Sequence, residues 1–105
     1  MKDIHGILTE LRRRLEQLYG GRLVGLTLFG SHARGDADPA SDIDVLVVLG
    51  GEVNPGLEIR RTGEIVSEIS LRHDVVISCV FLDEERFLHR NGPLLRNIRR
   101  EGIAA

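Results

Sequence analysis

Apolar residues near the amino terminus recur at the spacing of a helix. The intervals between them are four, three, four and three residues, in the set Ile4, Leu8, Leu11, Leu15 and Leu18. Such a stripe is typical of an amphipathic α-helix that buries one face. The glycine pair at positions 20 and 21 is a natural stop, so the pattern predicts a first helix that ends there.

Three short apolar runs have the length and composition of β-strands. They are Leu23–Phe29, Ile43–Leu49 and Val75–Phe81. The middle run is almost unbroken Val, Leu and Ile, which is typical of a strand buried on both faces.

Helical patterns follow the second and third runs. The i, i+3, i+4, i+7 spacing of a long helix is present in Thr62, Ile65, Val66 and Ile69. Beyond the third run, Asp83 is expected to cap a short helix, and a last helix is expected to end at Gly102. This order predicts an α/β domain built on a small sheet of about three core strands flanked by helices.

Composition narrows the class of protein. The chain has 105 residues, a formal net charge of −2, 42% hydrophobic and 29% charged residues. These values predict one globular domain over residues 1–105, exclude disorder and give no support to direct nucleic-acid binding. No apolar run reaches the roughly 18 residues of a membrane span, and the polar start does not resemble a secretory signal, so a cytoplasmic location is the default expectation.

Three further observations concern possible chemistry. A domain of this size builds one core and a shallow groove, so a partner is expected to complete any active site. A phosphate-binding P-loop is excluded, because Gly25 and Gly30 have its spacing but Ser31 stands where its lysine belongs. Cys79 is the single cysteine, alternates with apolar residues and is expected to be a core residue.

A glycine-serine turn directly follows the first strand. Gly30 permits close approach of a ligand, and Ser31 opens a short helix whose backbone N–H groups suit phosphate oxygens. Arg34, one helical turn later, is placed to reach the same anion. An ordinary turn is the alternative interpretation. His32, inside the motif, is expected to be an exposed helix residue.

Two aspartates enter the most apolar strand of the chain. Asp42 and Asp44 are two residues apart, so they project from the same face of the strand. Neighbouring carboxylates repel unless a cation neutralises them, and Mg²⁺ prefers such oxygen ligands together with substrate phosphates. A turn cap at the strand end is the alternative.

Asp74 precedes the third strand. If that strand lies beside the second and parallel to it, Asp74 falls near Asp42 and Asp44. Three acids at one sheet end are typical of two-metal phosphoryl or nucleotidyl transfer.

These motifs together resemble the minimal nucleotidyltransferases of the DNA polymerase β superfamily. The resemblance rests on the stretches 30–35, 41–47, 74–76 and 93–103, and thus covers nearly the whole chain. It implies a mixed sheet with the first strand antiparallel to the second, and transfer of a nucleoside monophosphate from ATP or another NTP to a hydroxyl. It also implies that Gly30, Ser31 and Arg34 hold the triphosphate, that Asp42 and Asp44 share two Mg²⁺ ions, and that Asp74 is the third metal ligand and base.

The resemblance also implies a partner. Small members of this family are typically encoded beside a HEPN-domain toxin, and some neutralise it by adding AMP to one of its tyrosines. Either that partner, in a hetero-oligomer, or a second copy, in a homodimer, is then expected to supply the missing wall of the groove. A non-catalytic antitoxin that neutralises its partner by covering it remains the alternative.

Overall fold

A computed structural model describes residues 3–105 and contains a four-stranded mixed sheet with the strand order β3-β2-β1-β4. The strands are β1 (Leu23–Phe29), β2 (Ile43–Leu49), β3 (Ile77–Asp83) and β4 (Ile103–Ala104). β1 is antiparallel to both β2 and β4, whereas β2 and β3 are parallel. The predicted mixed sheet with three core strands is therefore confirmed, and a two-residue edge strand is added to it. Residues 1 and 2 of the predicted domain lie outside the described part.

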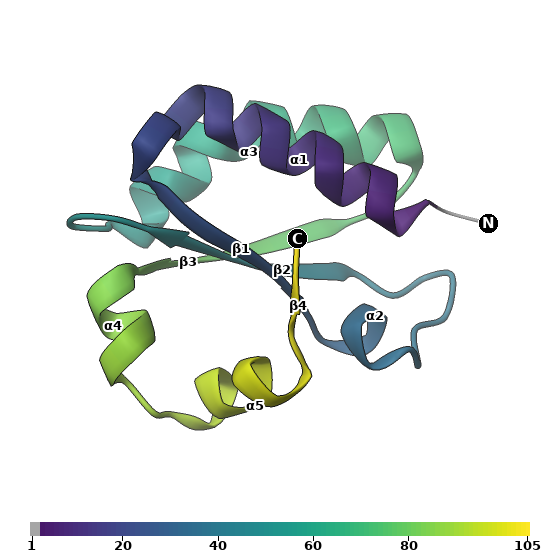
Figure 1. Cartoon of the computed structure of the whole chain (residues 1–105). Helices are drawn as coiled ribbons and strands as arrows, with labels where there is room; N and C mark the ends of the chain where they lie inside the picture. The colour runs from purple at the N-terminus through teal and green to yellow at the C-terminus, as the bar shows by residue number, and fades with distance from the viewer. Residues whose placement is uncertain (1–2) are drawn as a thin grey trace.

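Helices cover both faces of this sheet (Figure 1). α1 (Ile4–Tyr19) and α3 (Pro55–His73) pack together over one face, while α4 (Glu84–His89) and α5 (Pro93–Glu101) lie against the other. The four-residue helix α2 (Ser31–Arg34) sits at the end of β1, and a short 3₁₀ turn, η1 (Gly20–Arg22), connects α1 to β1. None of the helices within residues 3–105 is long and apolar enough to cross a membrane.

The helix ends follow from local sequence. The carboxylate of Asp3 accepts the amide hydrogen of Gly6 at 2.9 Å at the start of α1. Asn54 and Pro55 start α3 well before the apolar pattern at Thr62, because an asparagine cap and a proline in the first turn both favour helix initiation. As predicted, Asp83 caps α4, and its carboxylate accepts from the Arg86 amide at 2.7 Å.

β2 is the centre of two cores, because its residues alternate between them. Ile43, Val45 and Val47 pack in the core beneath α1 and α3. Leu46 and Val48 belong to the smaller core beneath α5. The burial of this strand on both faces, predicted from its composition, is confirmed. A strand packed on both faces gives the sheet a rigid centre, which holds the residues at the ends of the strand in place.

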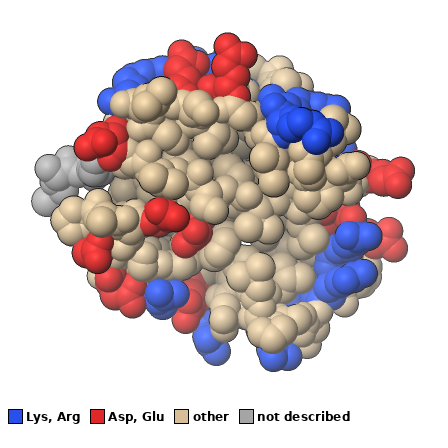
Figure 2. Space-filling view, turned by 180° about the vertical axis from the view of Figure 1, so that it is seen from behind, with Lys and Arg blue, Asp and Glu red and all other residues tan. Residues whose placement is uncertain are grey.

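The far side of the molecule shows how charge is distributed (Figure 2). Most blue and red side chains lie near the rim of this face, and its middle is largely uncharged. A shallow groove between α3 and the edge strand β3 is lined by uncharged residues, namely Ile59, Thr62, Gly63, Val66, Ser67, Ile77, Cys79 and Phe81.

Candidate nucleotidyl-transfer site

The two predicted carboxylates lie at the beginning of β2. Asp44 pairs in register with Phe29 of β1 on one side and with Ser78 of β3 on the other. Because alternate residues share a face, Asp42 and Asp44 project on the same side as Leu46, toward the layer that contains α5. Asp42 is exposed and Asp44 is half-buried. The structure therefore brings these two side chains together, as the spacing predicts.

The electrostatics of this pair favour a cation. Burial raises the pKa of the Asp44 carboxyl above its ordinary value, and the negative charge of Asp42 raises it further. His32 and Arg34 act in the opposite direction. A carboxyl whose charged form is disfavoured by a neighbouring carboxylate gains from a bound metal ion. The oxygen donors present thus fit Mg²⁺.

Gly30 joins the glycine-serine turn to these acids. Its backbone has φ 75° and ψ −156°, a conformation that residues with a Cβ rarely adopt. A Cβ placed on Gly30 would collide with Oδ2 of Asp44. Only glycine therefore allows the backbone of the turn to lie directly against the carboxylate, and this contact links the two sequence motifs in space.

The short helix α2 follows that turn. The amides of Ala33 and Arg34 both donate to the carbonyl of Gly30 at 3.1 Å, so the earlier amide of Ser31 lies at the helix start, where no intrahelical acceptor exists. Such N–H groups can bind phosphate oxygens. The structure thus brings Gly30 and Ser31 to the acid pair, as expected.

Arg34 has two acidic neighbours. Its Nε donates to Asp36 at 3.2 Å, and its NH1 lies 3.5 Å from Oε2 of Glu101, at the end of α5. The hydrogen bond to Asp36 is the main cause that raises the pKa of the Arg34 guanidinium. Because Arg34 also lowers the pKa of Asp44, its charge acts at the site even though its hydrogen bonds are directed elsewhere.

The structure does not bring Asp74 to the pair, which corrects the expected convergence of three acids. α3 continues to His73, and Asp74 caps it in the left-handed conformation with φ 51°. β3 therefore starts at Ile77, two residues later than predicted, and Ile77 pairs with Ile43. Asp74 thus lies three residues before the level of Ile43. Within residues 3–105, no three His, Cys, Asp or Glu side chains are grouped to hold a metal ion.

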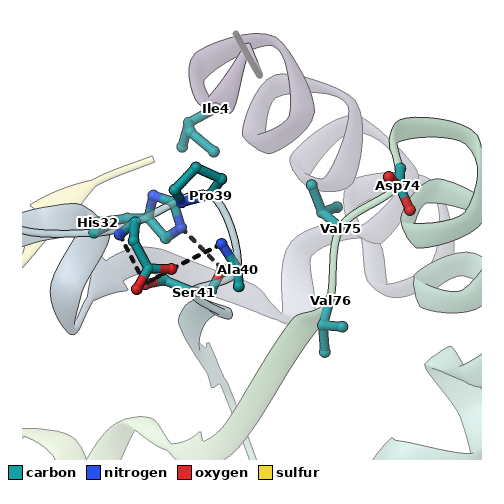
Figure 3. Close-up of a pocket in the computed structure, with 10 residues that line it drawn as sticks. Ile4, His32, Pro39, Ala40, Ser41, Asp74, Val75 and Val76 are labelled. Carbon is teal, nitrogen blue, oxygen red and sulfur yellow. Dashed lines mark hydrogen bonds between the residues drawn. The ribbon is translucent and has the colours of Figure 1, made fainter.

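Asp74 instead lines a cavity between the loop before β2 and the segment before β3 (Figure 3). The cavity has a volume of about 610 Å³. The loop before β2 forms one wall, and the segment before β3 forms the facing wall, where Figure 3 shows Val75 and Val76 opposite Pro39 and Ser41. Ser41 immediately precedes Asp42 in the chain, but neither Asp42 nor Asp44 lines the cavity.

Residues 8–104 match the nucleotidyltransferase domain family. The chain belongs to this family. A candidate protein adenylyltransferase of Methanocaldococcus jannaschii is 35% identical to this nucleotidyltransferase over 96 residues, which is 90% of either chain.

Solved structures agree with the fold of this nucleotidyltransferase. A candidate nucleotidyltransferase from Sulfolobus solfataricus superposes with a TM-score of 0.63 at 24% identity, covering 94% of this chain and 76% of the other. A toxin–antitoxin crystal structure with AMP-PNP gives a TM-score of 0.62 at 18% identity, covering 90% of this chain and 68% of the other. The predicted nucleotidyltransferase fold is confirmed.

The contacts of two residues of this nucleotidyltransferase site were not predicted from the sequence. His32 is half-buried rather than exposed, and its Nε2 lies 3.2 Å from the carbonyl oxygen of Ser41. This contact connects α2 to the residue before Asp42. The loop between them brings the two together, and its conformation does not follow from the spacing of residues in the sequence. Glu101 reaches the site only because α5 folds back under the sheet, so its contact with Arg34 has no local signal either.

Proposed function

We propose that this nucleotidyltransferase uses Mg²⁺ and ATP to transfer AMP to a hydroxyl of a partner protein. The acceptor that we propose is a tyrosine of a HEPN-domain toxin, which would make the protein an antitoxin. The observation that supports this proposal is the direct apposition of Gly30 and the Asp44 carboxylate, because the turn that would hold phosphate lies against the acids that would hold the metal. The protein adenylyltransferase name of the Methanocaldococcus relative supports a protein as the acceptor, and the toxin–antitoxin character of the AMP-PNP complex supports a toxin as the partner.

Asp42 and Asp44 are the residues that would hold the metal, as ligands shared by two Mg²⁺ ions. Their paired carboxylate oxygens and the raised pKa of Asp44 fit that role. When bound, Mg²⁺ would neutralise charge on the triphosphate and help to orient it. A bound metal ion would also stabilise the charged form of a half-buried carboxylate that lies beside a second one.

The triphosphate would lie on the turn next to the pair. The amide and hydroxyl of Ser31 would donate to phosphate oxygens, and Gly30 leaves room for them. Arg34 would contribute positive charge at the same place. Because Arg34 already contacts Asp36 and Glu101, we expect it to balance the charge of the triphosphate from the rim.

The acceptor oxygen would attack the α-phosphorus while pyrophosphate departs. The bond between the hydroxyl oxygen and phosphorus forms, and the bond from phosphorus to the bridging oxygen of the β-phosphate breaks. We assign to Asp74 the acceptance of the hydroxyl proton, because it lines a cavity that extends to Ser41, the residue before Asp42. Its position three residues before the level of Ile43 does not support its predicted role as a third metal ligand.

The test is direct. The purified protein is incubated with Mg²⁺, ATP and the protein encoded by the neighbouring gene, and the mass of that neighbour is measured. We expect an increase by one AMP, and we expect none with Asp44→Asn, which removes a charge at constant volume. A wild-type reaction without any mass increase on the neighbour contradicts the proposed acceptor.

One observation favours a second candidate function. Because Asp74 stands apart from the pair, the domain could bind metal and nucleotide without efficient transfer and act as a non-catalytic antitoxin. That function requires the Asp44→Asn variant to protect cells from the partner as well as the wild type does. Loss of protection by this variant, with complex formation intact, excludes it.

A further inference from the structure

We propose that the open edge of β3 and the groove beside it form a dimer interface, in which β3 pairs antiparallel with β3 of a second copy of this chain. The proposal concerns assembly, so it stands independently of the reaction proposed for the acid pair. The groove has a volume of about 210 Å³ and lies between α3 and β3. None of the residues that line it is charged.

The two edges of the sheet differ in length. β4 forms one edge and has only two residues, whereas β3 forms the other edge and has seven. β3 follows β2 in continuous register from Ile77 to Asp83, without a bulge. Proteins protect their sheet edges by keeping them short, or with bulges, charged side chains and proline. Shortness protects the β4 edge, and it does not protect β3.

The sequence of β3 also lacks the other kinds of protection. Residues 75–82 read Val-Val-Ile-Ser-Cys-Val-Phe-Leu and include no charged residue, proline or glycine. Within residues 3–105, β3 pairs with β2 alone. A long, uncharged edge strand readily pairs with another strand, so we expect a further element to cover it.

The backbone of β3 directs alternate polar groups at the open edge. The carbonyl of Val76 accepts the amide of Ile43 at 2.8 Å, so it points toward β2. In a parallel pair, every second residue bonds the same neighbouring strand. The amides and carbonyls of Ile77, Cys79 and Phe81 therefore point away from β2. They are the groups that an added strand would bond.

A second copy of β3 fits this edge because of its symmetry. Two identical strands related by a two-fold axis run antiparallel, and each supplies the donors and acceptors that the other needs. The same patch then meets itself, so a charged groove would repel its own copy. This groove is uncharged, and Ile59 within it is 55% exposed although it is a large apolar residue. Dimerisation would remove that apolar surface from water.

Self-association provides the first test. We expect sedimentation of the wild type over a concentration series to show a reversible monomer–dimer equilibrium. Ile59→Glu should weaken the dimer at least about tenfold, because pairing would bury an uncompensated charge on each copy. Ser67→Glu, at an exposed position of the groove, repeats the test if Ile59→Glu folds poorly.

A matched control is available on the same helix. Leu71 belongs to α3, is 83% exposed and lines none of the described cavities. Leu71→Glu therefore adds the same charge to α3 outside the groove, and the monomer–dimer equilibrium should stay within about twofold of the wild type.

Amide hydrogen exchange tests whether the strand edge itself is the contact. The outward amides of Ile77 and Cys79 should exchange at least about tenfold more slowly in the dimer than in the monomer, because pairing gives them acceptors. By the same alternation, the amides of Ser78 and Val80 point toward β2. They are bonded in both states and should change much less.

Several results would overturn the proposal. One is a wild type that stays monomeric throughout the series, including the case where the neighbouring gene's protein slows the outward amides instead. Another is a dimer that both groove variants leave intact, or that Leu71→Glu weakens equally. Outward amides that exchange as fast in the dimer as in the monomer also overturn it, because the copies would then meet through another face. None of these results bears on AMP transfer, which the mass measurement tests separately.

Discussion

Carboxylates lie at both ends of β2, and the protein surrounds them with opposite kinds of environment. At the carboxyl end, Glu58 is only 2% exposed, and its Oε1 accepts the Tyr19 hydroxyl at 2.7 Å. Arg22 and Arg61 lie 3.6 and 3.5 Å from its two oxygens. At the amino end, Asp42 and Asp44 face each other's charge, and the pKa of Asp44 is raised by burial and by Asp42.

The difference shows which carboxylates receive hydrogen bonds and positive charges from the folded chain itself. Glu58 receives its hydrogen bond and both cations from within the chain, so its role is to connect α1, the turn after it and α3. Asp42 and Asp44 lack an equivalent set of protein donors in the contacts of residues 3–105, and burial and the charge of Asp42 raise the pKa of Asp44 although His32 and Arg34 act against this. A site that costs stability until a ligand binds is typical of a functional centre.

The largest expected effect lies at the acid pair. Asp42→Asn should reduce AMP transfer at least about a hundredfold, because metal-assisted charge stabilisation is worth several kcal/mol in a transition state. Its unfolding midpoint should not fall, since the substitution removes repulsion from Asp44. Initial rates and urea unfolding of the same preparation check both statements. Glu85→Gln on α4, an exposed acid, is the control and should keep full activity.

The reverse pattern is expected at Glu58. Glu58→Ala should lower the free energy of unfolding by about 2–3 kcal/mol, because it removes hydrogen bonds to charged groups and leaves the Tyr19 hydroxyl without its acceptor. Glu16→Ala breaks an exposed ion pair with Arg12 instead and should cost less than about 0.5 kcal/mol. Urea unfolding measures the free energy of unfolding of both variants. Equal losses of stability in the two variants would contradict the structural role assigned to Glu58.

Gly30 separates the effects of backbone strain from those of charge. Gly30→Ala should cost about 2 kcal/mol, because φ 75° is strained for alanine and its Cβ meets Asp44. Gly25→Ala in β1 has open space around the added carbon and should be neutral or stabilising. Thermal unfolding with and without Mg²⁺ measures both. A tolerated alanine at position 30 would disprove the close apposition of turn and carboxylate.

The smallest expected effect is on the absorbance of Tyr19, which lies beside Glu58. Tyr19 is the single tyrosine of the chain, and burial, followed by its hydrogen bond to Glu58, raises the pKa of its hydroxyl well above the ordinary value. The unfolded chain ionises this group first, so the stability that it contributes is complete below the ordinary tyrosine pKa and is lost as pH rises through and above it. Absorbance at alkaline pH should therefore change only as the protein unfolds. A phenolate signal in the folded protein at the ordinary pKa contradicts this.

The sequence patterns predict the centre of the molecule better than its edges. The bounds predicted for β1 and β2 agree with the structure, because continuous burial leaves a continuous apolar run. β3 begins and ends two residues later than predicted, since α3 extends through His73 under the influence of contacts with α1 that no local pattern records. β4 is too short to have any pattern, and it forms because the chain pairs with Thr27 and Leu28 after α5.

The same distinction applies to the site. The adjacency of Asp42 and Asp44 follows from strand periodicity, and their contact with Gly30 follows from the antiparallel pairing of the strands that carry them. The position of Asp74 depends on where a helix stops, and the roles of His32 and Glu101 depend on how loops and α5 fold back. Sequence spacing predicts the relative positions of side chains within one element or between paired strands. It fails where tertiary packing sets the distance between them.

The most direct test of the account compares two conservative variants in one transfer assay. Asp44→Asn and Glu58→Gln each replace one carboxylate by an amide of similar volume, at opposite ends of β2. Below the melting transition, AMP transfer to the partner should be abolished in Asp44→Asn and retained in Glu58→Gln, whereas only Glu58→Gln should unfold at lower urea concentration. Transfer that survives in Asp44→Asn would contradict the assignment of the acid pair as the reaction centre.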